Sequence, residues 1–409
     1  MSNDQIEIVA PSNAVSPANP WLKHMVHTFS GLQHGRLSIV LPGGGIVHLG
    51  LNTYQGPQAR IILKSYKPIA KFWLNGELGF AQSYIDGDWD SPDLATFFDF
   101  VLANEQELVG QSAGNWSTRA LNRLRHLLNR NSRAGSKRNI AFHYDMGNDF
   151  YAKWLDKSMT YSSALYETGH ETLEQAQHIK YQAIAEMLDL QRDDNLLEIG
   201  CGWGGFSELA AREHGCRVHG LTLSREQLQY AHTRYQAAGI NELATASFTD
   251  YRDSEGLYDK IVSIEMFEAV GEENWDTYFQ TVYNRLKPGG VAVLQVITID
   301  EERFKTYRKG TDFIQRYIFP GGFLPSPDAV EHAVTRNNLK LERTRFFGPS
   351  YGRTCAEWQT RFQHAWDDIE PTGYDQKFKR MWEYYLSYCE AGFNAGSVNV
   401  GLFKIVKSA

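Results

Sequence analysis

The sequence predicts an α/β protein whose larger domain is a doubly wound sheet of mostly parallel strands, preceded by a smaller α+β domain. The chain has 409 residues, a length that suits two domains better than one. From about residue 172 onward, short apolar segments alternate with amphipathic helical stretches. Such alternation is typical of an open parallel sheet with helices on both faces.

The larger domain is expected to alternate strands and helices along the chain. Strands are expected at Asn195–Ile199, Cys216–Leu221, Ala244–Phe248, Tyr258–Ile264, Val291–Ile297 and Val398–Val406. Helices are expected at Leu173–Leu190 and Phe206–His214, and a third begins at Ser224. Ser224 is suited to be the N-cap of that helix with Gln227 as its capping-box partner, and Gly239 is suited to its C-terminal cap.

The N-terminal part has a different pattern. Residues 1–20 are polar, contain three prolines and predict disorder. Residues 21–112 predict the small α+β domain. Its strands are expected at Arg36–Leu41, Ile46–Leu49, Ala59–Leu63 and Ile69–Trp73. A helix is expected to begin at Pro92 and run through Asn104.

Residues 113–139 predict a basic amphipathic linker. Seven arginines and lysines occur between residues 115 and 139 without an acidic residue, and leucines recur there at spacings of three and four. Such a helix either packs one face on a domain, which we favour because most amphipathic helices do so, or docks on anionic lipid headgroups.

Composition limits the classes of function. The net charge is -7, so no overall positive field would hold nucleic acid. The four cysteines have no metal-ligand spacing, so no metal site is expected, and they suit a reducing cytoplasm. We see neither a signal peptide nor an apolar stretch long enough to span a bilayer. Any membrane contact is therefore expected to be peripheral.

A glycine-rich turn follows the first strand of the larger domain. Glu198 opens the turn, which contains Gly200 and Gly202 and precedes a helix. Glycines let a backbone turn sharply and approach a ligand closely. A dinucleotide site would also require an acid at the end of the next strand, but that strand ends Gly-Leu-Thr. The turn at 286–290 resembles the late turn of class I S-adenosylmethionine (SAM) methyltransferases, so we expect a Rossmann-like SAM site.

Several further motifs occur in one order and carry a family resemblance. They are His143–Asp149, Met159–Ala164, Glu198–Phe206, Leu221–Gln227, Asp250–Asp253, Ser263–Glu268, Tyr317–Gly322 and Phe347–Tyr351. Through these segments the chain resembles the cyclopropane fatty acid synthases, including the mycolic acid cyclopropane synthases and methyltransferases. The resemblance covers about 140–409, which it implies is a SAM-dependent methyltransferase domain with acyl-binding insertions.

The resemblance implies a set of residues that bind SAM. Tyr161 and Ser162 match residues that hold its carboxylate end, and Glu198, Gly200 and Gly202 match the loop against its methionine part. The remaining matches lie at the ribose and adenine positions and are Thr222, Ser224, Gln227, Tyr251, Arg252 and Ile264.

The resemblance also implies chemistry at a carbon–carbon double bond. An alkene attacks the methyl group of SAM, and the resulting cation loses a proton as a three-membered ring closes. Water must be excluded, aromatic faces stabilise the cation, and a base must stand near the methyl group. In the family this base is bicarbonate, held by the backbone amides at Ser163 and Ile297 and by the side chains of Glu268, Tyr351 and a histidine.

The chain departs from the family pattern at two of these positions. The family cysteine is Ser163 here, and the family histidine is Gln295. A glutamine amide can donate to an anion but cannot carry a proton at neutral pH. Either bicarbonate still binds, or Glu268 or Tyr351 takes the proton directly, or the cation gives a methylene- or methyl-branched chain.

The sequence therefore predicts a SAM-dependent C-methyltransferase of an unsaturated acyl chain, carried by a phospholipid. It would be cytoplasmic, make transient contact with a membrane surface and bind no nucleic acid. The sequence leaves open whether it forms a homodimer. Rival hypotheses are a lipid-binding protein without catalysis and a methyltransferase of a small polar molecule. Five residues either line an acyl tunnel or are ordinary helix packing: Tyr384, Tyr385, Tyr388, Cys389 and Phe393.

Overall fold

The computed structural model describes residues 6–9, 32–50, 56–109 and 146–409, so the basic segment 113–139 lies outside the described residues. The chain divides into two compact units. One comprises Met1–Arg125, Gly310–Tyr317 and Trp366–Ala395, and the other comprises His126–Lys309, Ile318–Ala365 and Gly396–Ala409. The sequence assigned 140–409 to a single domain, whereas the structure groups two stretches of that range with the N-terminal residues.

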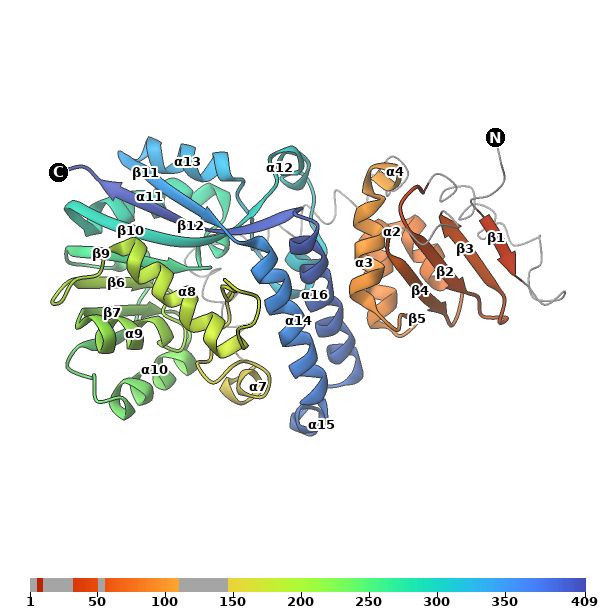
Figure 1. Cartoon of the computed structure of the whole chain (residues 1–409), viewed down its shortest axis with the longest axis horizontal. Coiled ribbons are helices and arrows are strands. Elements are labelled where there is room, and N and C mark those ends of the chain that lie inside the picture. Colours follow the sequence, from red (N-terminus) through yellow and green to blue (C-terminus); the bar gives the residue numbers. More distant parts are fainter. Residues whose placement is uncertain (1–5, 10–31, 51–55, 110–145) are drawn as a thin grey trace. The chain divides into compact units, whose positions relative to one another are not determined.

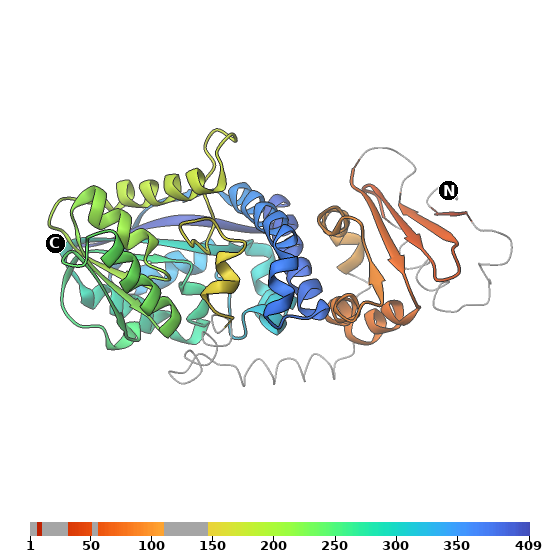
Figure 2. The ribbon, with the colours of Figure 1, turned by 90° about the horizontal axis from the view of Figure 1, so that it is seen from below.

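The first unit contains a five-stranded sheet in the order β1-β3-β2-β4-β5. Its strands are β1 (Ile6–Val9), β2 (Arg36–Val40), β3 (Ile46–Gly50), β4 (Gln58–Leu63) and β5 (Trp89–Asp90). Its helices are α2 (Lys67–Ile85), α3 (Leu94–Ala103), α4 (Glu105–Val109), α15 (Trp366–Ile369) and α16 (Gln376–Asn394). Helices α2 and α3 lie on the same side of the sheet (Figures 1 and 2). Strand β1 lies within residues 1–20, for which the sequence predicted disorder, and it pairs with β3.

Two features of this unit bear on the sequence predictions. The expected strand at Ile69–Trp73 is wrong, because these residues belong to α2, where Pro68 occupies the first turn and needs no backbone N–H. On α16, the Tyr384 ring lies 4.9 Å from Phe98 and 4.6 Å from Phe313. These contacts do not separate ordinary helix packing from the lining of an acyl tunnel, so both stay predictions for the α16 aromatics.

The second unit contains a seven-stranded sheet in the order β11-β12-β10-β9-β6-β7-β8. Its strands are β6 (Asn195–Ile199), β7 (Arg217–Thr222), β8 (Ala244–Phe248), β9 (Tyr258–Ile264), β10 (Leu286–Ile299), β11 (Leu339–Phe346) and β12 (Val398–Lys407). The pairs among β6 to β10 are parallel, and β12 runs antiparallel to both β10 and β11. The predicted mostly parallel α/β sheet is therefore confirmed.

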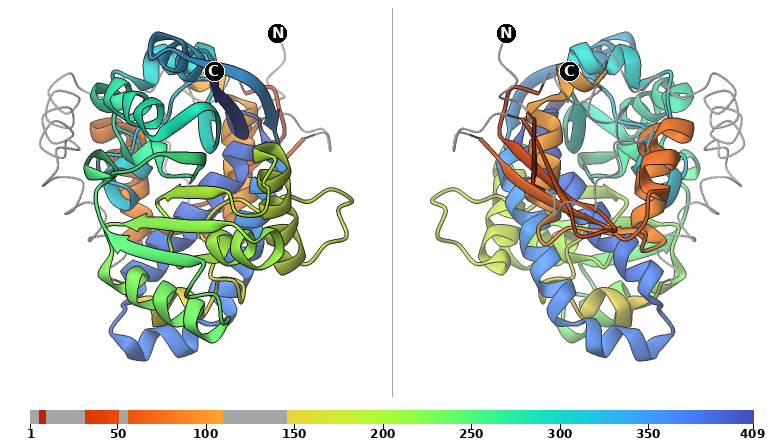
Figure 3. Two further views of the ribbon diagram at one scale, coloured as in Figure 1. Left: turned by 90° about the vertical axis from the view of Figure 1, so that its left-hand side faces the viewer. Right: turned by 90° about the vertical axis from the view of Figure 1, so that its right-hand side faces the viewer.

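Helices cover both faces of this sheet. They are α7 (Asn148–Ala152), α8 (Leu173–Leu188), α9 (Gly205–His214), α10 (Arg225–Ala237), α11 (Trp275–Arg285), α12 (Glu301–Tyr307), α13 (Pro327–Arg336) and α14 (Gly348–His364). Helices α8, α9 and α10 lie on one face and α11 and α13 on the other (Figure 3, left). Apolar residues of the second face form a continuous core with α11 and α13, which includes Leu197, Ile261, Leu294 and Phe279.

Local capping agrees with the sequence in part. Thr172 and Gln175 form a capping box at the start of α8. Ser224 caps α10 by accepting the Gln227 N–H, but the Gln227 side chain accepts from the Thr222 hydroxyl at 2.9 Å instead of closing a box. The expected turn at 286–290 lies within β10 as an irregularity of its register with β9 between Leu286 and Val291.

Candidate active site

The candidate site lies where the order of the parallel strands reverses. The chain runs outward from β6 to β7 and β8, and then returns to place β9 on the other side of β6. The turns after β6 and β9 consequently lie at the carboxyl ends of neighbouring strands, at the switch point where open α/β sheets bind ligands. The glycine turn follows β6, and the segment 265–268 follows β9.

The glycine turn has the geometry of a ligand-binding loop. Gly200 and Gly202 have φ angles of 84° and 52°, which glycine adopts without strain. A Cβ on Gly200 would lie 2.9 Å from the Met266 side chain, so the loop approaches the end of β9 closely. A Cβ on Gly202 would meet no atom within 4 Å, so there is room for a ligand beside this residue.

Polar groups at the end of β7 form the next part of the site. The Thr222 hydroxyl accepts the Ser224 N–H at 3.1 Å and donates to Gln227, as described above. All three side chains are buried, with no acidic group among them. The structure thus brings together the residues assigned to the ribose side.

Three further expected SAM contacts have other partners. The Glu198 carboxylate is buried and accepts a hydrogen bond from the Ser207 hydroxyl, and burial raises its pKa to about 8. The Arg252 guanidinium binds Asp250 through two hydrogen bonds of 2.8 and 2.6 Å. Tyr251 packs against Tyr278 at 5.3 Å between ring centroids. A SAM-binding role of Glu198, Tyr251 and Arg252 stays a prediction.

The five residues expected to carry the chemistry lie around two carboxylates. Glu265, at the end of β9, accepts the Ser163 N–H at 2.8 Å and the Tyr351 hydroxyl at 2.6 Å. The Gln295 amide donates to the same carboxylate at 2.6 Å. Gln295 lies opposite Ile264 in the parallel register of β10 and β9, which explains this contact.

Glu268 provides the second carboxylate. It lies in the 3₁₀ turn Phe267–Ala269 and is 8 % exposed. Its Oε1 accepts the Ile297 N–H at 2.5 Å. Among the described residues, neither Glu268 Oε2 nor Gln295 Oε1, both buried, has a hydrogen-bond partner. Buried polar atoms are normally paired, so these two oxygens mark where a ligand or water would bind.

A buried lysine contributes positive charge behind these carboxylates. Lys180 on α8 is fully buried and donates to the Ser162 hydroxyl at 2.7 Å. The Ser162 carbonyl in turn accepts from Gln177, so α8 fixes the segment that carries the Ser163 N–H. Burial lowers the pKa of Lys180 to about 7, and the charges of Glu265 and Asp156 oppose that fall.

The two carboxylates have different electrostatic surroundings. Burial raises the pKa of Glu268 to about 8, and the charge of Glu265 adds to the rise. Burial also raises the pKa of Glu265, but the hydrogen bonds from Tyr351 and Ser163 lower it, as does the charge of Lys180. A carboxylate with several donors retains its charge more readily than one with a single donor. Glu268 is therefore the member of the pair that binds a proton more readily.

Aromatic rings form one wall beside the carboxylates. Tyr161 packs on Trp358 at 5.2 Å and on Tyr151 at 5.4 Å between centroids. Tyr351, whose hydroxyl binds Glu265, lies edge-on to Trp358 at 6.0 Å. Trp203 of the glycine turn contacts Tyr151 at 5.1 Å, which joins this wall to the loop. Such faces can stabilise a cation through their quadrupoles.

Sequence reasoning singled out neither Glu265 nor Lys180 as a site residue. Glu265 was visible as an acid directly after an apolar strand, three residues before Glu268. Lys180 was visible at helical spacing from Ala176 and Ile184, on the face of α8 that is buried. A charged residue in either position is costly to bury without a partner, so its presence there indicates a buried polar site.

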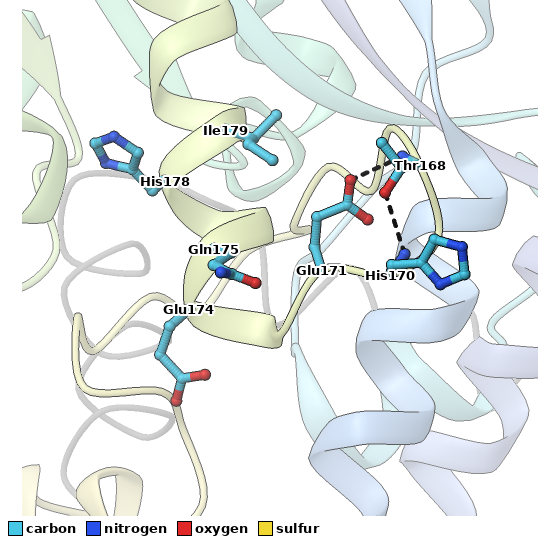
Figure 4. A pocket seen from close by; sticks show the side chains of 7 residues that line it. All are labelled: Thr168, His170, Glu171, Glu174, Gln175, His178 and Ile179. Carbon is cyan, nitrogen blue, oxygen red and sulfur yellow. Dashed lines mark hydrogen bonds between the residues drawn. The ribbon is translucent and has the colours of Figure 1, made fainter.

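A surface pocket of about 610 Å³ lies elsewhere in the same unit (Figure 4). It is lined by Thr168, His170, Glu171, Glu174, Gln175, His178 and Ile179. The Glu171 carboxylate accepts the backbone N–H groups of residues 167, 168 and 169, which tightens the loop before α8. The pocket uses exposed positions of α8, whereas Gln177 and Lys180 point to the candidate site.

Comparisons with known proteins identify the family. The family model described as mycolic acid cyclopropane synthetase matches residues 131–403. A tuberculostearic acid methyltransferase, UfaA1, of Mycobacterium tuberculosis is 35% identical over 81% of this chain and 79% of its own length. A cyclopropane-fatty-acyl-phospholipid synthase of Escherichia coli is 35% identical over 80% of this chain and 82% of its own.

A solved structure agrees with these relatives. The mycolic acid cyclopropane synthase CmaA1, complexed with SAH and CTAB, is 29% identical, with a TM-score of 0.63. The match covers 66% of this chain and 98% of that chain. In the part of this chain that the structure describes, no helix is long and apolar enough to cross a membrane. The chain belongs to the mycolic acid cyclopropane synthetase family and is a SAM-dependent methyltransferase of the fatty-acid methyltransferase and cyclopropane synthase group.

Proposed function

We propose that this enzyme transfers the methyl group of SAM to a carbon–carbon double bond of an unsaturated acyl chain that is carried by a phospholipid. The observation that supports this most directly is the pair of carboxylates, Glu265 and Glu268, beside the glycine turn. The contact between Gly200 and Met266 places that turn next to the segment that bears both acids. Methyl transfer to an alkene requires such a basic group near the methyl donor, whereas transfer to an amine does not require a paired acid in the same way.

The chain's own residues would perform three tasks. The glycine turn and the groups of Thr222, Ser224 and Gln227 would bind SAM, whose sulfonium supplies the electrophilic methyl group. The aromatic wall around Tyr161 and Trp358 would exclude water and stabilise positive charge on the acyl chain. The centre formed by Ser163, Glu268, Gln295, Ile297 and Tyr351 would hold the negative charge that removes a proton.

The balance of protons and electrons limits the product. The alkene forms a bond to the methyl carbon, and the electron pair of the broken carbon–sulfur bond stays on sulfur. If the new methyl group then loses a proton, its electron pair closes a cyclopropane. If a hydride first shifts from the alkylated carbon to its neighbour, the same loss gives a methylene branch. A saturated methyl branch would need a separate hydride donor, so we propose a ring or methylene product.

Two observations support a phospholipid as the carrier of the acyl chain and a contact with the membrane surface. The E. coli relative is named for a phospholipid substrate, and the sequence of residues 113–139 predicts a basic amphipathic helix. Anionic headgroups attract such helices. We therefore propose that the enzyme acts at the surface of the cytoplasmic membrane without spanning it. A homodimer stays an open expectation.

Two rivals make different predictions for the same experiment. A lipid-binding protein without catalysis would bind lipid and leave it unchanged, and a methyltransferase of a small polar molecule would methylate a soluble acceptor. Lipids from a host that expresses the full chain should contain a new acyl species 14 mass units heavier than its unsaturated precursor, the mass of an added CH₂ (by the balance above). Fragmentation distinguishes a ring from a methylene branch. An unchanged acyl profile, together with methyl transfer to a soluble acceptor, would refute the proposal.

A further inference from the structure

The Glu265 carboxylate occupies the centre of the donor set. Three donors from three separate segments converge on it: the Ser163 N–H, the Tyr351 hydroxyl and the Gln295 amide. The fourth expected donor, the Ile297 N–H, is bound to Glu268. Each of the four donors that the sequence assigned to a small bound anion therefore has a carboxylate oxygen of the chain itself as its acceptor.

The backbone at Glu265 indicates that this placement is imposed by its surroundings. Glu265 has a φ of 51°, in the left-handed region that non-glycine residues seldom adopt. Its N–H donates to the Gln295 carbonyl at 2.8 Å, which holds the residue in this conformation. Strained residues of this kind persist where neighbouring structure over-determines them, and they concentrate at functional sites.

The surroundings of Glu265 also suit a group that meets a substrate. Both carboxylates lie in a setting largely removed from water, and Glu265 keeps more solvent exposure than Glu268. Burial raises the pKa of both acids, but three donors and the charge of Lys180 oppose the rise at Glu265, while Glu268 has one donor and a carboxylate as its neighbour. Paired acids whose environments differ in this way take different roles, one as base and one as proton holder.

We propose that the Glu265 carboxylate is the catalytic base of this enzyme and stands in place of a bound bicarbonate. The inference rests on the proposed function. One carboxylate oxygen takes a proton from the methyl group newly bonded to the acyl chain. The electron pair of that C–H bond closes the ring, or forms the methylene double bond after a hydride shift. The resulting neutral Glu265 returns its proton to solvent when the product leaves.

Bound bicarbonate does not fit the described residues. It would have to displace Glu265 from all three of its donors, and the displaced carboxylate would then lie beside the new anion. Like charges in a site of low dielectric repel strongly, and the same three donors cannot serve both anions. Gln295 supports the same conclusion, because an amide can hold a permanent carboxylate but cannot relay a proton.

The first test measures the binding of an anion without any turnover. Sodium bicarbonate is titrated calorimetrically into the full chain and into the variants Glu265→Gly and Glu265→Gln. We expect heat of binding only for Glu265→Gly, because removal of the carboxylate frees the three donors, whereas the glutamine amide still fills the space. Binding of bicarbonate to the unaltered chain, at an affinity no weaker than that of Glu265→Gly, would overturn the proposal.

The second test measures turnover with SAM and vesicles of an unsaturated phospholipid, in buffer freed of carbon dioxide. The unaltered enzyme should keep its rate to within about twofold when bicarbonate is removed, because general-base catalysis here needs no added anion. Glu265→Gln should lose at least about 100-fold, the usual contribution of a positioned base. Added formate or bicarbonate should restore part of the rate of Glu265→Gly and none of that of Glu265→Gln.

Two matched variants separate this role from structural damage. Glu268→Gln removes the neighbouring acid and should lose less than about tenfold, because a protonated acid and an amide are both neutral. Glu171→Gln alters a carboxylate that also holds three backbone N–H groups, far along the chain from the acids, and should leave the rate unchanged. Glu265→Gln must retain SAM binding by calorimetry. A dependence of the unaltered enzyme on bicarbonate, or equal losses in Glu265→Gln and Glu268→Gln, would contradict the proposal.

The two tests distinguish a failure of this inference from a failure of the proposed function. If the unaltered chain binds SAM but alters no acyl chain, the proposed function fails, while the bicarbonate titration still decides which group occupies the donors. If acyl product forms only with added bicarbonate, the proposed function stands and the inference about Glu265 fails.

Discussion

The two halves of the candidate site are built differently. The half that suits SAM consists of a backbone turn at Gly200 and Gly202 and of neutral groups after β7 that bind one another. The half beside it consists of charged side chains, Glu265, Glu268 and Lys180, held in a largely buried setting. The first half comes from two neighbouring strands, whereas the second draws its donors from a loop, strand β10 and helix α14.

This difference separates binding from chemistry. A glycine turn binds by leaving space and by presenting backbone groups, so its energetic demands are local. Charged groups in a low-dielectric site strongly affect one another's protonation, so their demands are collective. We expect substitutions in the second half to change stability and turnover together, and substitutions in the first half to change mainly the affinity for SAM.

The largest expected effect comes from removing the buried cation. Lys180→Met should lower the free energy of unfolding by about 1–3 kcal/mol, because it leaves the buried Ser162 hydroxyl without its donor and removes a positive charge that acts on Glu265 and Asp156. Urea denaturation measures this loss, and Lys153→Met, at an exposed lysine, provides the control. If Lys180→Met is as stable as the unaltered chain or more stable, Lys180 is neutral in the folded protein. The contrast between a neutral SAM half and a charged half of the site would then be weaker.

The next largest effect tests the glycine turn. Gly200→Ala must adopt a φ of 84° and approach Met266 at 2.9 Å. The left-handed conformation alone costs about 1–2 kcal/mol, so the affinity for SAM should fall about tenfold. Gly169→Ala is a matched control, because Gly169 has a φ of 81° on a surface loop and open space around its Cβ position. Calorimetry should find unchanged SAM binding in that control.

The pH dependence of stability sharpens the contrast within the charged half. The pKa of Glu268 rises from 4.5 in the unfolded chain to about 8 in the fold. The folded state therefore holds an extra proton between these values, and stability falls as pH increases through this window, by at most about 1.4 kcal/mol per pH unit from this group. Thermal unfolding from pH 5 to 8 should show a shallower decline for Glu268→Gln. If stability declines equally with pH in the unaltered chain and in Glu268→Gln, the extra proton of the folded state is bound by a group other than Glu268.

The smallest effect is expected at Arg252. Its guanidinium is occupied by Asp250, at 2.6 and 2.8 Å. Arg252→Lys should therefore change the affinity for SAM by no more than about threefold, or about 0.7 kcal/mol, although it loses the two-pronged contact with Asp250. A larger loss by calorimetry would assign Arg252 to the SAM half of the site, as the resemblance implies.

The local parts of the fold were predictable from the sequence. The strands β6 to β9, the glycine turn and the helix starts at Thr172 and Ser224 follow from apolar runs, glycines and caps that act over a few residues. The sequence predicted a strand at Ile69–Trp73, where the structure has part of helix α2. A short apolar run is too short to show a periodicity that distinguishes a strand from a buried helix segment. The strand β1 was missed because its partner β3 supplies most of its stability.

The sequence by itself determined the parallel sheet, the glycine turn and the motifs that name the family. Only the tertiary structure decided which acid the donors hold. Ser163, Gln295 and Tyr351 lie 102, 30 and 86 residues from Glu265 along the chain. Their convergence depends on strand register and helix packing, which bring distant segments together and which no local pattern encodes. The same packing buries Lys180 close enough for its charge to act on Glu265, because a charge removed from water is stable only beside opposite charge and hydrogen-bond donors or acceptors.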